Sequence, residues 1–117
     1  MIKYNQMVVD ELADADVDRL FHALADATRR DIVRRVLVEE QSISGLARRY
    51  PMSMTAVQKH VSVLEEAGLV TKHRQGREQR VLGSVQAIDR ARRLLDEYER
   101  IWTDRFDRIG ELLAEPT

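Results

Sequence analysis

Hydrophobic residues recur along most of this chain at intervals of three and four, the spacing that places side chains on one face of an α-helix. Glycine and proline, which most often interrupt helices, number only five and two. Helices are therefore expected over residues 7–13, 17–24 and 28–39. A carboxylate supplies an N-cap for each of the last two: Asp14 or Asp16, and Asp26. Their apolar stripes are predicted to face a core: Val17, Leu20, Phe21, Leu24, Ile32, Val33, Val36 and Leu37.

Two short helices joined by a tight turn are predicted next. Residues 41–43 are too few for more than a bend or a single strand bridge, and Ser44 is expected to cap a helix over 45–50. Pro51 ends that helix because it lacks a backbone N–H and disfavours helical geometry at the residue before it. Ser53 then caps a second helix after a turn of about three residues, the connection found in helix-turn-helix motifs. Its inward residues are Val57, Val61 and Leu64.

Strand signals follow this second helix. Gly68 is expected to end the helix in the left-handed conformation, with Leu69 packing back on the last turn. Residues 69–74 and 78–82 then alternate as two strands, with Gly76 in the turn between them.

One long helix completes the predicted elements. It begins after Ser84 as N-cap and runs to about Ala114, with an apolar stripe along one side. The other side carries Arg, Asp and Glu. So long an apolar stripe on a terminal helix indicates a partner surface.

The fold class expected from these elements is mainly α (α+β), a winged helix-turn-helix with a two-stranded hairpin wing and a long C-terminal dimerisation helix. A length of 117 residues fits one winged-helix domain over residues 1–117, and a second copy would help to bury its apolar surface. Within it, the helix-turn-helix covers 44–67, the wing 69–82 and the dimerisation helix 84–114.

Charge is distributed unevenly along the chain. The net charge is −1, but residues 1–41 carry six Lys/Arg and nine Asp/Glu, residues 42–82 seven and three, and residues 83–117 six and eight. The three segments therefore carry −3, +4 and −2. A basic segment between two acidic ones is expected when one face of a protein meets phosphate.

The outer face of the second motif helix is predicted to read DNA. In a helix-turn-helix this helix enters the major groove, where base edges distinguish all four base pairs. Gln58 can bond adenine, Lys59 can reach guanine or a phosphate, and small residues let the helix sit deep. The residues assigned to base readout are Thr55, Ala56, Gln58, Lys59 and Ser62. The plain alternative is an ordinary solvated helix face, which the turn, the cap and the wing argue against.

Contacts to the DNA backbone are expected from the wing and from helix starts. The hairpin over 72–80 carries four Lys/Arg and only one acid, and its tip can follow phosphates or place an arginine in the minor groove. A charged hairpin also protects a sheet edge from aggregation, which leaves the lack of balancing acids unexplained. For the arginines near helix starts, solvation is an equal alternative. The residues assigned are Arg29, Arg30, Arg48, Ser53, Lys72, Arg74, Gln75 and Arg77.

An apolar and aromatic stripe marks the predicted dimer interface. Aromatic side chains dominate both cores and interfaces, and we prefer this interpretation to a ligand pocket. The interface residues assigned are Val8, Leu12, Leu95, Tyr98, Trp102, Phe106, Ile109 and Leu113.

Several kinds of chemistry are not predicted. The chain has no cysteine, which excludes disulfides and thiolate metal sites and fits a cytoplasmic location. Neither a signal peptide nor an apolar run of membrane-spanning length is present, so no membrane partner is expected. His60 lies at the edge of the inward helix face and is interpreted as a packed or hydrogen-bonded residue. No nucleophile–base pair, metal cluster or glycine-rich phosphate loop can be assembled, so no enzyme activity, metal or cofactor is predicted.

Two segments resemble the ArsR/SmtB family of bacterial winged-helix repressors. HALADATRRDIVRRV resembles the family form ALADPTRxxIL, with Ala27 where proline is usual, and SMTAVQKHVSVLEEAGLVTKHRQGRE resembles the family's recognition helix and wing. The resemblance implies a homodimer built from the first and last helices that binds a pseudo-palindromic operator and blocks transcription. It also implies sensing, but the cysteine motif and the C-terminal histidine ligands of metal-sensing members are absent here. The chain therefore resembles members without those metal sites.

We accordingly expect a cytoplasmic, homodimeric DNA-binding repressor whose partners are a double-stranded operator, a second copy and an effector of unidentified chemistry, if any. The alternative is a winged-helix protein-interaction module whose basic segment meets an acidic partner without specific DNA binding. A hydrolytic enzyme ranks third, for lack of any catalytic constellation.

Overall fold

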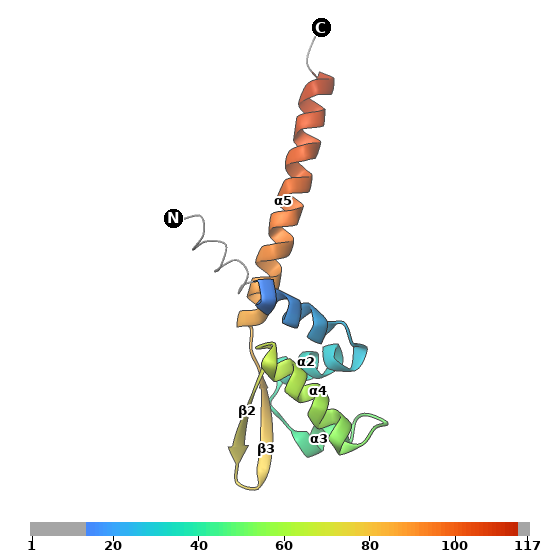
Figure 1. The fold of residues 1–117 in the computed structure, drawn as a ribbon, viewed down its shortest axis with the longest axis vertical. Helices are drawn as coiled ribbons and strands as arrows, with labels where there is room; N and C mark the ends of the chain where they lie inside the picture. Colours follow the sequence, from blue (N-terminus) through green and yellow to red (C-terminus); the bar gives the residue numbers. More distant parts are fainter. Residues whose placement is uncertain (1–13, 115–117) are drawn as a thin grey trace.

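The computed structural model, which describes residues 14–114, consists of helices and one small sheet whose hairpin projects from them (Figure 1). Residues 14–24 are helical. The elements that follow are α2 (Ala27–Val38), β1 (Gln41–Ser42), α3 (Ile43–Ala47), α4 (Met54–Glu66), β2 (Val70–Gln75), β3 (Glu78–Gly83) and α5 (Gln86–Ala114). The winged helix-turn-helix fold with a long C-terminal helix is thereby confirmed. The predicted helix over 7–13, with Val8 and Leu12, lies outside the described residues.

The sheet has three antiparallel strands in the order β1–β3–β2. The predicted hairpin is β2 and β3, which pair from Val70 opposite Gly83 to Gln75 opposite Glu78. The short stretch after α2 adds a third strand, because Ser42 pairs with Arg80. The wing is therefore anchored to the helical body at its base and free at its tip.

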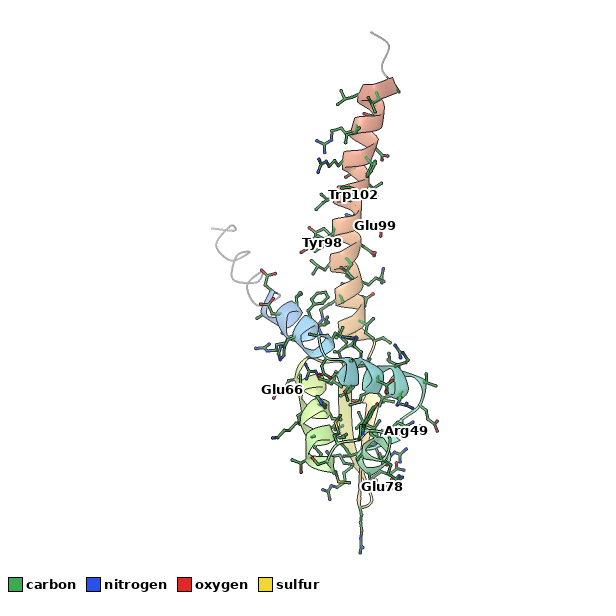
Figure 2. The ribbon with its side chains drawn as sticks, turned by 90° about the vertical axis from the view of Figure 1, so that its right-hand side faces the viewer. Arg49, Glu66, Glu78, Tyr98, Glu99 and Trp102 are labelled. Carbon is green, nitrogen blue, oxygen red and sulfur yellow. The ribbon has the colours of Figure 1, made fainter. Side chains whose placement is uncertain are left out.

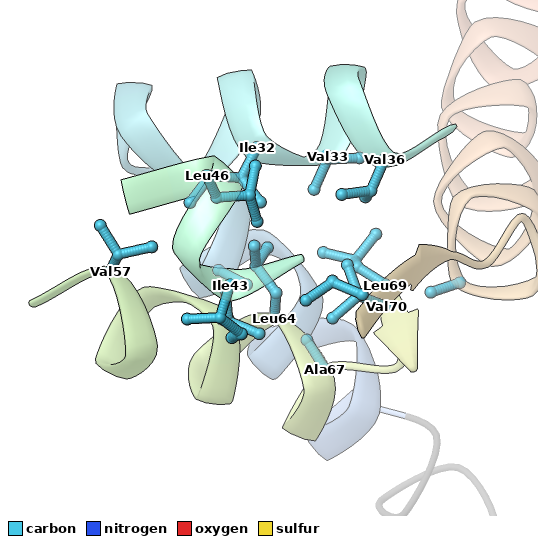
Figure 3. Close-up of a cluster of buried hydrophobic side chains, with 14 of the residues drawn as sticks. Ile32, Val33, Val36, Ile43, Leu46, Val57, Leu64, Ala67, Leu69 and Val70 are labelled. Atoms are coloured by element: carbon cyan, nitrogen blue, oxygen red, sulfur yellow. The ribbon is translucent and has the colours of Figure 1, made fainter. Parts of the chain in front are cut away.

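A single hydrophobic core joins α2, α3, α4 and the base of the sheet (Figure 3). Val57, Val61 and Leu64 of α4 are fully buried, as their spacing predicts. Most of the predicted stripe residues of residues 14–38 also face the core, but Phe21 and Leu37 stay 38% and 41% exposed. Burial of one complete face of α4 leaves its opposite face to solvent, and this fixes which residues can meet a ligand.

Local capping explains most helix ends. Asp26 and Ser53 cap α2 and α4 as predicted, since Asp26 Oδ1 accepts from Arg29 N at 3.0 Å and Ser53 Oγ from Ala56 N at 3.1 Å. Gly68 (φ +77°) ends α4, and its N–H and that of Leu69 bond back to the carbonyls of Glu65 and Leu64. This is the Schellman arrangement that ends helices at glycine.

Three predicted caps are wrong. Ser42, not Ser44, caps α3, because Ser42 Oγ accepts from Gly45 N at 3.0 Å. The helix then ends at Ala47, so residues 48–53 link the two motif helices in place of the predicted three-residue turn. Residue 14 is already helical, and the Asp16 carboxylate meets arginine side chains rather than backbone N–H groups. Ser84 was predicted to cap α5, but the helix begins one residue later than that cap would require. It starts at Gln86, and the Val85 carbonyl accepts the N–H of Asp89.

Helix α5 rises away from the rest of the fold (Figure 1). Only Ala87 of this helix is buried. An ion pair of 3.3 Å between Arg90 and Asp16 holds its first turns against helical residues 14–24. Within residues 14–114, no helix combines the length and the apolar character needed to cross a membrane.

Candidate nucleic-acid interface

The outer face of α4 presents the residues predicted to read bases. Thr55, Gln58 and Lys59 are exposed, whereas Ala56 and Ser62 are half-buried at the edge of the face. All five lie on one element that is capped at both ends and packed on the core. A rigid helix with a polar, small-residue outer face is the geometry that major-groove reading requires.

The wing extends beyond α4 as an exposed basic tip. Arg74, Gln75 and Arg77 are exposed around Gly76, whose φ of +64° allows the tight turn between β2 and β3. No ion pair is recorded for Arg74 or Arg77 within residues 14–114. Their guanidinium groups are therefore available to phosphate oxygens.

The base of the wing is tied to the body by ion pairs. Lys72 Nζ lies 3.3 Å from Glu65 Oε1 of α4. Lys72, which was predicted to contact the DNA backbone, is therefore already ion-paired within the chain. His73 Nε2 lies 2.6 Å from Glu40 Oε1, and Arg80 Nε lies 3.6 Å from the same oxygen. These contacts fix the direction of the wing relative to α4.

The other side chains predicted to contact the DNA backbone differ in how many hydrogen bonds they already make within the chain. Arg48 is exposed, and it lines a polar hollow of about 410 Å³ between α3 and the base of the sheet. Arg30 is exposed, but its Nη1 donates to the carbonyl of Leu24 at 2.7 Å. The Ser53 hydroxyl oxygen accepts the capping bond and its proton can still be donated. All three remain available to contact DNA.

Arg29 is half-buried and engaged within the chain. Its Nε donates to the carbonyl of Ala23 at 2.7 Å and its Nη2 to the carbonyl of His22 at 3.0 Å. Its Nη1 lies 3.3 Å from His60 Nδ1, in agreement with the interpretation of His60 as a hydrogen-bonded residue. The hydrogen bond from the Arg29 backbone N–H lowers the pKa of Asp26 below its ordinary value. A role for Arg29 in contacting phosphate would require it to leave these partners.

A second internal contact, which the sequence did not predict, holds the turn before α4. Tyr50 donates to Asp31 Oδ2 of α2 at 2.6 Å. The hydrogen bond from Tyr50, followed by that from Arg35, lowers the pKa of Asp31, while burial and the same contact raise the pKa of Tyr50 to about 12. The only sequence signal was an aromatic hydroxyl immediately before Pro51.

The predicted dimer residues of α5 are exposed in the single chain. Tyr98 and Trp102 project from the same stretch of this helix (Figure 2). The rings of Trp102 and Phe106 pack edge to face, with their centroids 4.8 Å apart. The exposed fractions are 54% for Leu95, 57% for Tyr98, 57% for Trp102, 56% for Phe106, 44% for Ile109 and 83% for Leu113. An apolar surface of this length is typical of a protein interface.

Metal-binding groups are not brought together in the described part of the chain. No set of three His, Asp or Glu residues between 14 and 114 is placed to hold a metal ion.

Comparison with known proteins places this chain among helix-turn-helix transcriptional regulators. A family model described as a helix-turn-helix domain matches residues 24–73. The uncharacterized HTH-type transcriptional regulator YuzN of Bacillus subtilis (strain 168) is 43% identical over 67 residues, which are 51% of this chain and 73% of that protein.

Solved structures show the same architecture. An ArsR-like transcriptional regulator from Rhodococcus sp. RHA1 is 31% identical, with a TM-score of 0.78 over 88% of this chain and 94% of that one. A homodimeric winged helix-turn-helix DNA-binding domain from Mycobacterium bovis is 26% identical, with a TM-score of 0.59 over 77% of this chain and 80% of that one. The names of these proteins describe transcriptional regulators or a DNA-binding domain.

Proposed function

Because the chain belongs to the ArsR family of winged helix-turn-helix transcriptional regulators, we propose that it is a cytoplasmic homodimeric repressor, one winged-helix domain per chain, that occludes a pseudo-palindromic promoter operator. DNA-binding transcriptional regulation follows from the family. One observation supports the finer proposal of operator binding. An exposed reading face on α4 occurs together with a basic wing tip.

The reading mechanism follows from this arrangement. Two copies of α4 enter successive major grooves about 34 Å apart, and each wing lies along the flanking backbone. Gln58 and Lys59 contact base edges, and Thr55, Ala56 and Ser62 provide close packing against them. Arg74, Gln75 and Arg77 of the wing, with Arg30, Arg48 and Ser53, supply backbone contacts that position the helix without reading sequence.

Dimerisation is proposed through α5. The homodimeric domain from Mycobacterium bovis supports this proposal, as does the exposed stripe from Leu95 to Leu113. A symmetric dimer presents the same reading face twice, which matches a two-fold symmetric operator.

Selection of bound duplexes from a random library tests the proposal. The full chain should enrich a two-fold symmetric sequence and bind it about 10³-fold or more tightly than scrambled duplex at physiological salt. The same sequence placed over a promoter should lower transcription in a reporter assay when the protein is supplied. Binding without enrichment of any sequence would instead fit the second candidate, a protein-interaction module, and the absence of salt-sensitive binding to random duplex would support that candidate directly.

A further inference from the structure

The Arg29 guanidinium connects three helices at one point. It lies in the first turn of α2 and donates to the Ala23 and His22 carbonyls, which are at the end of helical residues 14–24. Carbonyls of the last turn generally lack partners within their own helix, although the His22 carbonyl also accepts the N–H of Ala25 at 3.2 Å. The remaining arm, Nη1, reaches His60 Nδ1 of α4 at 3.3 Å, across 31 residues of sequence.

The chemistry of the contact defines the charge of His60. A guanidinium is a donor only and stays protonated at all ordinary pH values, so the partner nitrogen has to accept. Nδ1 can accept only in a neutral imidazole whose proton is on Nε2. A protonated imidazole would place a second N–H and a second positive charge against Arg29.

The position of His60 makes this contact matter for DNA reading. It lies on α4 directly after Gln58 and Lys59 and before Ser62, while Val61 beside it is fully buried. The contact therefore fixes the reading face against both helical residues 14–24 and the start of α2. Displacing a reading helix by about 1 Å changes every base contact made from it.

We propose that Arg29 is a positioning residue for the recognition helix and that DNA binding requires neutral His60, so that acidification weakens the affinity for the operator. The inference rests on the proposed function, because it concerns how tightly the same α4 face binds DNA. Histidine is the side chain that ordinarily changes charge between pH 5 and 8, which places the effect within an accessible range.

Charged groups on both α2 and α4 act on His60, and the contact with Arg29 is the closest of them. Arg29 of α2 is in direct contact at 3.3 Å and opposes protonation. The Asp26 carboxylate, at the start of α2, attracts a charged His60, but it lies beyond ion-pair distance and is held by the Arg29 backbone N–H. Lys59, the neighbour on α4, adds to the repulsion.

The test compares pH profiles of operator affinity for the full chain and its variants. His60→Asn places an amide oxygen close to the position of Nδ1 and cannot be protonated, so its affinity is the reference against which the wild type is compared at each pH. Between pH 8 and pH 5.5 the wild-type affinity should fall about tenfold relative to that of His60→Asn. Using this ratio cancels the pH effects of all other groups, which are common to both proteins.

Two further variants complete the design. Arg29→Gln should lower affinity at pH 8 and lose the acid-dependent fall, because no cation then faces His60. His22→Asn is the matched control, since the His22 side chain is exposed and only its carbonyl meets Arg29. It should reproduce the wild-type profile. In the free wild-type protein, the ¹⁵N shifts of His60 at pH 8 should show the proton on Nε2.

The outcomes separate this inference from the proposed function. If the wild type and His60→Asn bind the operator with parallel pH profiles, or if His60 carries its proton on Nδ1, the inference is overturned while specific DNA binding stands. Should the wild type bind no duplex sequence selectively at pH 8, both the proposed function and this inference fall. If Arg29→Gln does not fold, as judged by circular dichroism, the operator affinity of the wild type relative to that of His60→Asn across pH still tests the inference.

Discussion

The hydroxyl of Tyr50 lies 2.6 Å from Asp31 Oδ2, so the residue before Pro51 is bonded to the middle of α2. The same carboxylate oxygen accepts from Arg35 Nε at 2.8 Å. Since residues 48–53 connect α3 to α4, this contact holds the link between the two motif helices against the body of the fold. Together with the Arg29–His60 contact, it ties both α4 and the link before it to α2.

Removing the Tyr50 hydroxyl should lower stability in a pH-dependent way. Tyr50→Phe should reduce the free energy of unfolding by about 1–2 kcal/mol at pH 7, because it removes a hydrogen bond to a charged group that is partly solvated. The folded-state pKa of Asp31 is lowered, so its contribution is present above the unfolded value of about 3.9 and is lost as pH falls through the folded value. The difference between the two proteins should therefore shrink below about pH 4.

Urea unfolding from pH 7 to pH 3 at constant protein concentration measures that difference. Tyr98→Phe is the control, since the Tyr98 side chain is exposed and no hydrogen bond of its hydroxyl is recorded within residues 14–114. It should cost much less than Tyr50→Phe at every pH. A constant deficit for Tyr50→Phe down to pH 3 would contradict the assigned role of the Asp31 charge.

Local chemistry made part of this fold predictable. Ser53 and Gly68 act at the positions their residue types favour, because each effect depends only on neighbours within one turn. Ser42 and Ser44 could not be separated on the same grounds, since either hydroxyl can cap a helix and the choice depends on pairing between β1 and β3. A single candidate is not sufficient either, since Ser84 was the only cap predicted for α5 and the helix begins at Gln86.

Contacts between distant residues could not be predicted in this way. Tyr50 and Asp31 are 19 residues apart and Arg29 and His60 are 31 apart. Whether such side chains meet depends on the crossing of α2 with α3 and α4, which no local pattern specifies. For the same reason, the sequence alone predicted that Arg29 contacts the DNA backbone and could not show its hydrogen bonds within the chain. The α4 face and the wing tip followed from periodicity and turn chemistry alone.

Two glycine substitutions should change stability in opposite directions. Gly68→Ala places a Cβ in the left-handed conformation at φ +77°, which costs about 1–2 kcal/mol. The new Cβ meets Arg90 Nη2 at 3.6 Å and Ala87 Cβ at 3.9 Å, both ordinary contacts, so the backbone is the source of the cost. Gly110→Ala, inside α5 with nothing within 4 Å, should stabilise by about 0.5–1 kcal/mol. Urea unfolding of both variants tests this pair, and equal effects would contradict it.

Gln58 should carry sequence preference at one position of each half-site. Gln58→Ala removes a side chain able to bond adenine through two atoms, and the expected loss of discrimination is about 1–3 kcal/mol at that position. Competition titrations with operators changed at single base pairs measure it. Glu66→Ala, at the far end of α4, is the matched control and should leave base preference unaltered. If Gln58→Ala has the same ratio of operator affinity to scrambled-DNA affinity as the wild type, Gln58 does not read bases.

Arg77 should contribute affinity without sequence preference. It is exposed at the wing tip next to Gly76, so Arg77→Ala should weaken binding to operator and scrambled duplex by the same factor. Each lost phosphate contact lowers the slope of log affinity against log salt by about 0.9. Titrations at several salt concentrations measure that slope. Arg93→Ala on α5 supplies a control of equal charge change away from α4 and the wing, and a slope identical for both variants would exclude the wing from the interface.

Trp102 should be central to the contact between two copies. It lies midway along the exposed stripe of α5 and packs edge to face on Phe106, which presents a preformed aromatic surface to a partner. Trp102→Glu would place a charge inside that contact and should cost at least about 2 kcal/mol, or about 30-fold in the dimer dissociation constant. Sedimentation equilibrium at micromolar concentration measures this. Asp104→Lys changes charge on the polar side of the same helix and should leave the dimer intact. A wild type that is monomeric under these conditions, or a Trp102→Glu variant as dimeric as the wild type, would show that the stripe does not join two copies, and the two-fold symmetric operator would then lose its structural basis.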